Sequence, residues 1–189
     1  MATTDQRLFG KLQPELSSVP PGQIVEQAYD KRAREVIGLC KVLIARFGQE
    51  EAGDILRTAR YEPSYDEGRR AAEAMGMPKD IDSYIEAHWV PKPRATIEEY
   101  LKTNKAPFWS APGHFTYRTK TKAVHRTSNW CFVWEAFKKV ADAEMIAFLA
   151  KYYCVHDAAF AKGFNPSMKF EMTKNFFRGD DFCEYTFEI

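Results

Sequence analysis

The chain has 189 residues, of which 45 % are hydrophobic and 14 % aromatic, enough apolar material for the core of one domain. Its 27 basic and 26 acidic residues leave a formal net charge of +1, so no strong electrostatic field favours nucleic acid as a partner. The longest apolar runs, such as Glu144–Ala150, are far shorter than the roughly 20 residues of a membrane-spanning helix. The first residues also lack the basic start and apolar core of a secretory signal, so we expect a cytoplasmic protein without membrane partners.

The first half of the chain predicts helices. Residues 1–21 are polar and end in Val-Pro-Pro, so we expect an arm outside the domain. From Gln23 to Phe47 apolar residues recur at helical spacing, and Gly48 is expected to end that helix. Shorter helical segments follow over 50–60, 65–75, 80–89 and 96–102, the last opened by a capping box. Residues 22–105 are therefore predicted to be mainly helical.

The pattern changes after Pro107. Gly113–Thr119 alternates aromatic and polar residues, and Lys122–Trp130 is predicted to be its antiparallel partner. Later elements are predicted as helices over 132–140 and 142–162 and as strands over 169–177 and 182–189, joined by a turn at Gly179-Asp180. The sequence thus predicts an α+β fold, with a helical N-terminal half packed on a small antiparallel sheet and a buried helix in the C-terminal half. We expect a single domain over 22–189, with its α+β part over 106–189.

The four cysteines of the chain are Cys40, Cys131, Cys154 and Cys183. None forms a CxxC pair, so the zinc-ribbon signature is absent. In a chain of this size for which no secretory signal is expected, we expect reduced thiols rather than a disulfide framework. We also expect no cofactor. Cys183 shares one face of its predicted strand with Tyr185 and Phe187 and should face inward. Cys131 begins a predicted helix, where the helix end can lower the pKa of a thiol. Each cysteine can equally be core packing, because free cysteine behaves as a small buried hydrophobe.

The stretch KYYCVHDAAFAKGFNP, residues 151–166, places a cysteine, a histidine and an aspartate within four positions. On the predicted helix, Cys154 and Asp157 are neighbours on a face of small residues, whereas His156 falls on a bulky aromatic face. A direct pair of Cys154 and His156 is therefore not expected. Aspartate is rarely buried unless it is paired, so Asp157 indicates either a structural ion pair or a carboxylate that moves protons in a pocket.

Five segments carry a family resemblance: CFVWEAF from Cys131, CVHD from Cys154, GFNP from Gly163, KFEMT from Lys169 and GDDFCEYTF from Gly179. Together they resemble the L-2-amino-thiazoline-4-carboxylic acid hydrolase family. The resemblance extends over residues 23–189 and is most specific from Cys131 onward. The chain departs from the family pattern at residues 171–176, where EMTKNF replaces a strand with a basic-Thr-x-Thr pattern.

The resemblance implies a hydrolase that opens a small cyclic substrate by adding water at the carbon of a C=N bond. A cysteine thiolate can attack such a carbon, and a carboxylate can shuttle the proton. We expect Cys183 or Cys154 to be the nucleophile and Asp157 to be the acid–base group or the anchor of a substrate amine. Substrate contacts are expected from Cys131, His156, His114 and Trp130. His88 also lies outside the motif and could be brought to the pocket by folding.

Alternatives from other classes stay open. The side chains of Cys131, Cys154, Asp157 and Cys183 could converge as ligands of a metal ion. The chain could instead be a non-enzymatic module that binds a small molecule without a proton-transfer group. The helix over 23–47 could also pair two copies into a homo-oligomer, although an amphipathic stripe more often contacts the core of its own chain.

Overall fold

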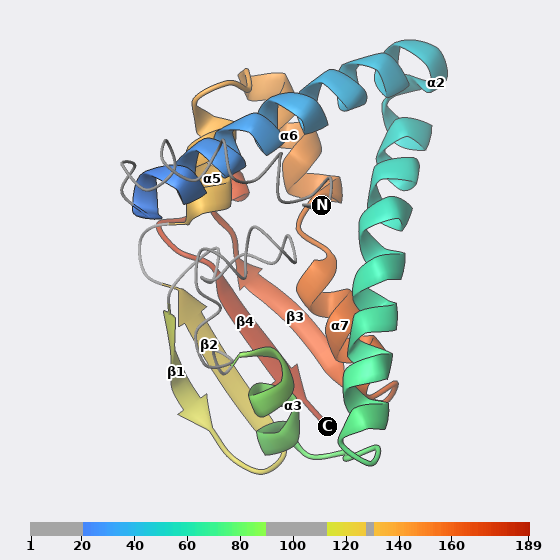
Figure 1. The fold of residues 1–189 in the computed structure, drawn as a ribbon, viewed down its shortest axis with the longest axis vertical. Coiled ribbons are helices and arrows are strands. Elements are labelled where there is room, and N and C mark those ends of the chain that lie inside the picture. The colour runs from blue at the N-terminus through green and yellow to red at the C-terminus, as the bar shows by residue number, and fades with distance from the viewer. Residues whose placement is uncertain (1–20, 90–112, 128–130) are drawn as a thin grey trace, which may run out of the picture.

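The computed structural model describes residues 21–89, 113–127 and 131–189 (Figure 1). In chain order the elements are α2 (Pro21–Ala74), α3 (Ile81–His88), β1 (Gly113–Arg118), β2 (Lys122–Thr127), α5 (Phe132–Lys138), α6 (Ala143–Tyr152), α7 (His156–Phe164), β3 (Lys169–Lys174), the 3₁₀ helix η1 (Phe176–Arg178) and β4 (Glu184–Glu188). The predicted α+β class is confirmed. The predictions for residues 1–20, for a helix over 96–102 and for Trp130 lie outside the described residues.

The long helix α2 is two helices joined at Gly48. This glycine has φ 80° and ψ 170°, a backbone conformation that residues with a Cβ rarely adopt, so the predicted end of the first helix is confirmed. The two separate helices predicted over 50–60 and 65–75 are wrong, because one helix continues through Pro63. The first half of α2 packs over α5 and α6, and the second half runs beside α7 (Figure 1).

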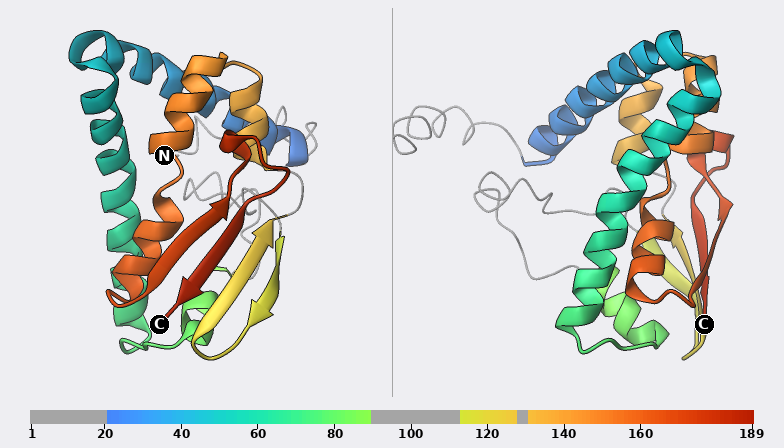
Figure 2. Two further views of the ribbon diagram at one scale, coloured as in Figure 1. Left: turned by 180° about the vertical axis from the view of Figure 1, so that it is seen from behind. Right: turned by 90° about the vertical axis from the view of Figure 1, so that its right-hand side faces the viewer.

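The described strands form one antiparallel sheet of four strands in the order β1-β2-β4-β3. Alternate residues are buried along the two central strands: Ala123, His125 and Thr127 in β2, and Tyr185 and Phe187 in β4. The helices α3 and α7 and the second half of α2 lie on one side of this sheet (Figure 2). The strand predicted over 169–177 is too long, because β3 ends at Lys174 and residues 176–178 form η1.

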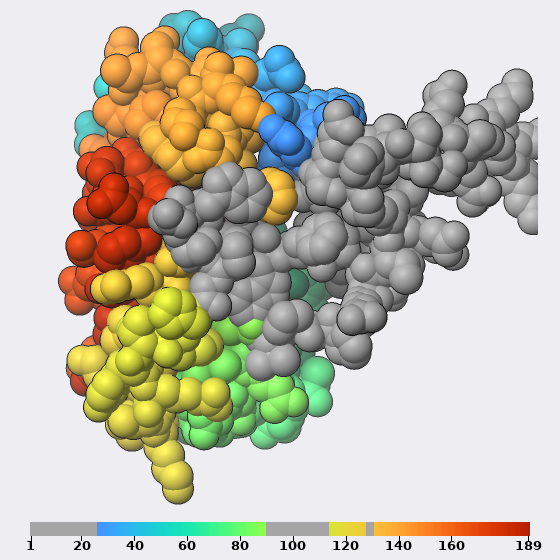
Figure 3. Space-filling view, turned by 90° about the vertical axis from the view of Figure 1, so that its left-hand side faces the viewer, coloured from blue at the N-terminus to red at the C-terminus, as the bar shows by residue number. Residues whose placement is uncertain are grey.

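Two apolar clusters make up the core of the described residues. One lies between the sheet, α3 and α7 and contains Tyr84, Phe164 and Phe187. The other lies between α2, α5 and α6 and contains Phe137 and Leu149. In the space-filling view α5 and α6 form the upper part of the molecule, and α3, β1 and β2 form the lower part (Figure 3). Functional side chains at the junction of the two clusters can therefore come from both halves of the chain.

The helix predicted over 142–162 is wrong in one respect: it is broken between Tyr152 and His156. In a continuous helix the carbonyl of Tyr153 would accept the N–H of Asp157. Instead, it accepts Nε of Arg60 at 2.7 Å and the N–H of Val155 at 3.0 Å. A side chain from α2 thus donates to a carbonyl that would otherwise accept a hydrogen bond within the helix. Cys154 lies in the break rather than on a helix face.

No helix within the described residues has both the length and the apolar character required to cross a bilayer. The four cysteines are free thiols in the structure.

Candidate active site

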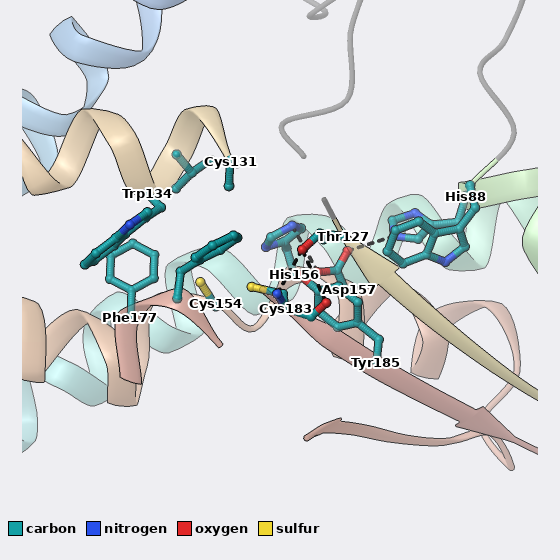
Figure 4. Close-up of a pocket in the computed structure, with 13 residues that line it drawn as sticks. His88, Thr127, Cys131, Trp134, Cys154, His156, Asp157, Phe177, Cys183 and Tyr185 are labelled. Atoms are coloured by element: carbon teal, nitrogen blue, oxygen red, sulfur yellow. Dashed lines mark hydrogen bonds and ion pairs between the residues drawn. The ribbon is translucent and has the colours of Figure 1, made fainter. Parts of the chain in front are cut away.

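A cavity of about 220 Å³ lies between the sheet, α5 and the break that separates α6 from α7 (Figure 4). Polar and thiol groups line much of it: His88, Thr127, Cys131, Cys154, His156, Asp157, Cys183 and Tyr185. Aromatic rings, including Trp89, Trp134, Phe176 and Phe177, complete the wall. Thiols, imidazoles, a carboxylate and hydroxyls from distant parts of the sequence therefore share one small cavity.

The cavity brings together most of the residues that the sequence singled out. Cys131, Cys154, Asp157, Cys183 and His156 all line it, and Cys183 faces inward as predicted. By contrast, His114 is exposed on β1 and is not among the lining residues. The lining contacts thus come from the start of α5, the break before α7, the start of α7 and the strand β4.

The carboxylate of Asp157 lies between two imidazoles (Figure 4). Its Oδ1 is 3.0 Å from Nε2 of His88, and its Oδ2 is 3.3 Å from Nε2 of His156. Only 9 % of the Asp157 side chain is exposed. Because His88 ends α3 and Asp157 begins α7, packing of these two helices on the sheet creates the contact between residues 69 positions apart. Asp157 is therefore a buried carboxylate with both oxygens engaged.

The environment of Asp157 keeps it ionised. Burial by itself raises its pKa, but the electrostatic interaction with His156 and the hydrogen bond from His88 outweigh burial, and the pKa falls from 3.8 to about 2. A carboxylate with such a pKa stays negative at neutral pH. It can orient an imidazole and stabilise its positive charge, but it is a poor proton carrier.

This pKa shift makes a prediction about stability in acid. A carboxylate with a lowered pKa in the folded state stabilises the fold above its unfolded pKa, and the contribution is lost as the pH falls through the folded pKa. For a fall from 3.8 to about 2, the free energy of unfolding of wild type relative to Asp157→Asn should be about 2 kcal/mol greater at pH 5 than at pH 2. Urea unfolding of both proteins across this range measures the difference, and a constant difference would contradict the pKa.

Two other imidazoles are held in fixed environments. His156 exposes 36 % of its side chain, yet the surrounding protein lowers its pKa by burial, against the opposing effect of Asp157. His125 lies 4.1 Å from the ring of Trp89, centroid to centroid, and burial lowers its pKa to about 4. Both are therefore neutral imidazoles at neutral pH.

His88 is fixed by its neighbours in another way. Its ring stacks on Phe160 with centroids 4.1 Å apart and meets the edge of Trp89 at 5.1 Å. These contacts and the bond to Asp157 hold the ring against the cavity. No local pattern marks His88 as a partner of Asp157, because the two residues lie 69 positions apart along the chain.

The three thiols of the cavity are protonated at rest. Burial raises the pKa of Cys131 to about 11 and also raises the pKa of Cys154 and of Cys183. The lowered pKa expected for Cys131 at a helix N-terminus is wrong, because burial outweighs the hydrogen bonds from the backbone of Trp134 and Val133. Any thiol that attacks a substrate here needs a base to take its proton, and imidazoles line the same cavity.

The backbone of Cys183 is held by Thr127. The hydroxyl of Thr127 accepts the N–H of Cys183 at 2.8 Å, and the carbonyl of Cys183 accepts the N–H of Thr127 at 2.9 Å. Cys183 therefore has a rigid position just before β4, whereas Cys154 lies in the break that Arg60 holds. Neither Thr127 nor Arg60 was predicted from the sequence, and no local pattern marks them.

Among the residues that the structure describes, no group of three His, Cys, Asp or Glu side chains is arranged to hold a metal ion. The set of ligands considered from the sequence, Cys131, Cys154, Asp157 and Cys183, lines the cavity without forming such a group.

The fold and the cavity define a class: a small α+β protein with one cavity lined by thiols and imidazoles. A family model described as L-2-amino-thiazoline-4-carboxylic acid hydrolase matches residues 28–187, and the chain belongs to this family. The resemblance seen in the sequence is thereby confirmed. Comparisons with curated proteins and with solved structures gave no match.

Proposed function

We propose that the protein is a hydrolase that opens a small heterocyclic ring of the cyclic amidine or thiazoline type. The observation that carries this proposal is the ionised Asp157 between His88 and His156, in one cavity with Cys154 and Cys183. The family name, which describes a hydrolase of a thiazoline carboxylic acid, supports the same reaction class.

The size and walls of the cavity support a compact, flat substrate. Its volume of about 220 Å³ is below the roughly 300–1,000 Å³ of sites for drug-sized ligands. Aromatic rings such as Trp89, Trp134 and Phe177 offer flat apolar surfaces to a planar ring. A single five-membered ring with polar substituents fits this description.

The proposed reaction starts with a thiol. The sulfur of Cys183 or Cys154 attacks the C=N carbon, and its proton passes to an imidazole oriented by Asp157. The bond from this carbon to a ring heteroatom breaks, and the heteroatom takes the proton from the imidazole. Water then attacks the same carbon, and the sulfur leaves as the thiol. The net reaction adds one water molecule across the broken ring bond.

The raised pKa values of the thiols favour a second route within the same function. Here an imidazole takes a proton from water, and the water attacks the C=N carbon directly. The thiols then only shape the cavity. The two routes use the same carboxylate and differ in whether a covalent intermediate forms.

Replacing each candidate nucleophile tests the covalent route. We expect Cys183→Ala or Cys154→Ala to lower the single-turnover rate of ring opening by about 10³-fold, because the bond-forming atom is removed. Cys40→Ala is the matched control, since Cys40 is a buried thiol of the cluster between α2, α5 and α6 and does not line the cavity. Intact-mass spectrometry of quenched wild type should show the protein plus one substrate.

The outcomes separate the alternatives. Full rates in both cavity variants and no adduct would rule out the covalent route in favour of direct attack by water. If wild-type protein opened none of a panel of thiazoline, oxazoline and imidazoline carboxylates, the hydrolase proposal itself would be wrong.

A further inference from the structure

Arg60 reaches from the second half of α2 into the break between α6 and α7. Its Nε donates to the carbonyl of Tyr153 at 2.7 Å, and its guanidinium lies 3.8 Å from the centroid of the Tyr153 ring. Its Nη2 lies 3.4 Å from Nδ1 of His156. These contacts fix the guanidinium beside the cavity, next to an imidazole that contacts Asp157.

The chemistry of these groups leaves one protonation state for His156. A guanidinium carries only N–H donors and stays charged, so Nδ1 of His156 must meet it with a lone pair. The proton of the neutral ring is then on Nε2, which faces the carboxylate Oδ2 of Asp157 at 3.3 Å. Both contacts are satisfied by the tautomer protonated on Nε2 and by no other state.

We infer that Arg60 is a positioning residue that locks His156 as the neutral tautomer protonated on Nε2 and leaves His88 as the imidazole that exchanges protons with the substrate. His88 donates from Nε2 to Asp157, and its Nδ1 forms no hydrogen bond to any residue of 21–89, 113–127 or 131–189. That nitrogen has a lone pair in the neutral ring and can take a proton. The role of His88 rests on the proposed function, whereas the tautomer of His156 does not.

The charges around His156 agree with this assignment. Burial lowers the pKa of His156 most strongly, Asp157 raises it, and the positive charges of Arg60 and Arg32 lower it further. A second proton on Nδ1 would point at the guanidinium of Arg60 and lose its hydrogen bond. His156 therefore acts as a fixed hydrogen-bond donor to the carboxylate of Asp157. His88 also donates to Asp157, and its second ring nitrogen stays available to take a proton.

Nuclear magnetic resonance of ¹⁵N-labelled protein tests the tautomer directly. Long-range ¹H–¹⁵N correlation separates protonated from unprotonated ring nitrogens, and the chain has only four histidines, so His156→Gln and His88→Gln assign the signals. In wild type we expect His156 to show an unprotonated Nδ1 and a protonated Nε2. In Arg60→Met its titration midpoint should rise by about one pH unit or more, since a nearby positive charge is removed.

Arg57→Met is the matched control. Arg57 lies one turn earlier on α2, where its side chain pairs with Asp54 and its guanidinium lies 5.2 Å from the ring centroid of Tyr152. It makes no contact with His156 in the described structure, so its loss should leave the His156 signals as in wild type. A proton on Nδ1 of wild-type His156, or an unchanged titration in Arg60→Met, would overturn the inference.

The activity test addresses His88 separately. The pH dependence of kcat/KM should follow the titration of His88 that the same spectra record. Compared with Arg60→Met, Arg60→Lys should restore the wild-type pH profile only in part, because Lys lacks the planar guanidinium of Arg. A profile that follows His156 would overturn the assigned roles. If wild type opened no ring, the role of His88 would be wrong together with the proposed function. The spectra would still decide the tautomer of His156.

Discussion

Replacing Asp157 by Asn is expected to abolish ring opening, with a fall of about 10³-fold or more in the single-turnover rate. Asn has the same shape as Asp, but its side chain carries one acceptor oxygen and one NH₂ donor. It can therefore accept a hydrogen bond from His88 or from His156, but not from both. One imidazole is left facing a donor, so either its tautomer changes or its contact is lost. The negative charge that stabilises a protonated imidazole is also removed.

The measurement is ring opening under single-turnover conditions at neutral pH, with circular dichroism to establish that the variant is folded. Asp82→Asn is the matched control, because Asp82 lies on the same helix as His88 and forms an exposed ion pair with Arg118. Exposed pairs contribute about 0–1 kcal/mol, so this control should keep both its rate and its fold. A folded Asp157→Asn protein with the wild-type rate would mean that the carboxylate takes no part in the chemistry.

Local patterns in the sequence predicted the elements whose causes are local. The bend at Gly48 follows from a residue that tolerates positive φ, and the α+β class follows from a change of periodicity after Pro107. The inward side of β4 follows from the alternation around Cys183 and Tyr185. In each case the residues that specify the feature lie within a few positions of it.

Features caused by tertiary contacts could not be predicted in this way. The helical pattern over 142–162 is unbroken in the sequence. The break lies where Nε of Arg60, 93 positions away, donates a hydrogen bond to the carbonyl of Tyr153. The partnership of His88 with Asp157 depends on how α3 and α7 dock on the sheet. Cys131 lies at a helix N-terminus, where the pKa of a thiol can be lowered, but burial by distant residues raises its pKa instead.

The docking of α7 itself depends on two glycines, Gly68 of α2 and Gly163 of α7, that each pack against the backbone of the other helix. A Cβ added to Gly163 would overlap the backbone carbonyl of Tyr65, and a Cβ added to Gly68 would overlap the backbone carbonyl of Phe160. Backbone atoms of a packed helix cannot rotate away as a side chain can. The two helices therefore approach each other more closely than any residue with a side chain would allow, and this approach sets where α7 places Asp157 relative to Arg60.

Gly163→Ala is accordingly expected to destabilise the fold strongly, even though Ala favours a helix. Overpacking costs about 3 kcal/mol where the backbone must move, and helix propensity returns only about 1 kcal/mol, so the net loss is about 2 kcal/mol. For a chain of this length such a loss lowers Tm by about 4–8 °C. Below that temperature the displaced α7 should also reduce ring opening, because the Asp157 carboxylate moves away from His88.

The same substitution at Gly38, Gly38→Ala, is expected to have the opposite effect on stability. Gly38 lies on α2 with no atom within 4 Å of an added Cβ, so the exchange should raise stability by about 0.5–1 kcal/mol through helix propensity alone. Thermal unfolding of both variants gives the comparison, with opposite signs expected for the two changes. Equal stabilisation by Gly163→Ala and Gly38→Ala would show that α7 and α2 can separate freely, in which case the position of Asp157 must be fixed by His88 and His156 rather than by the helix contact.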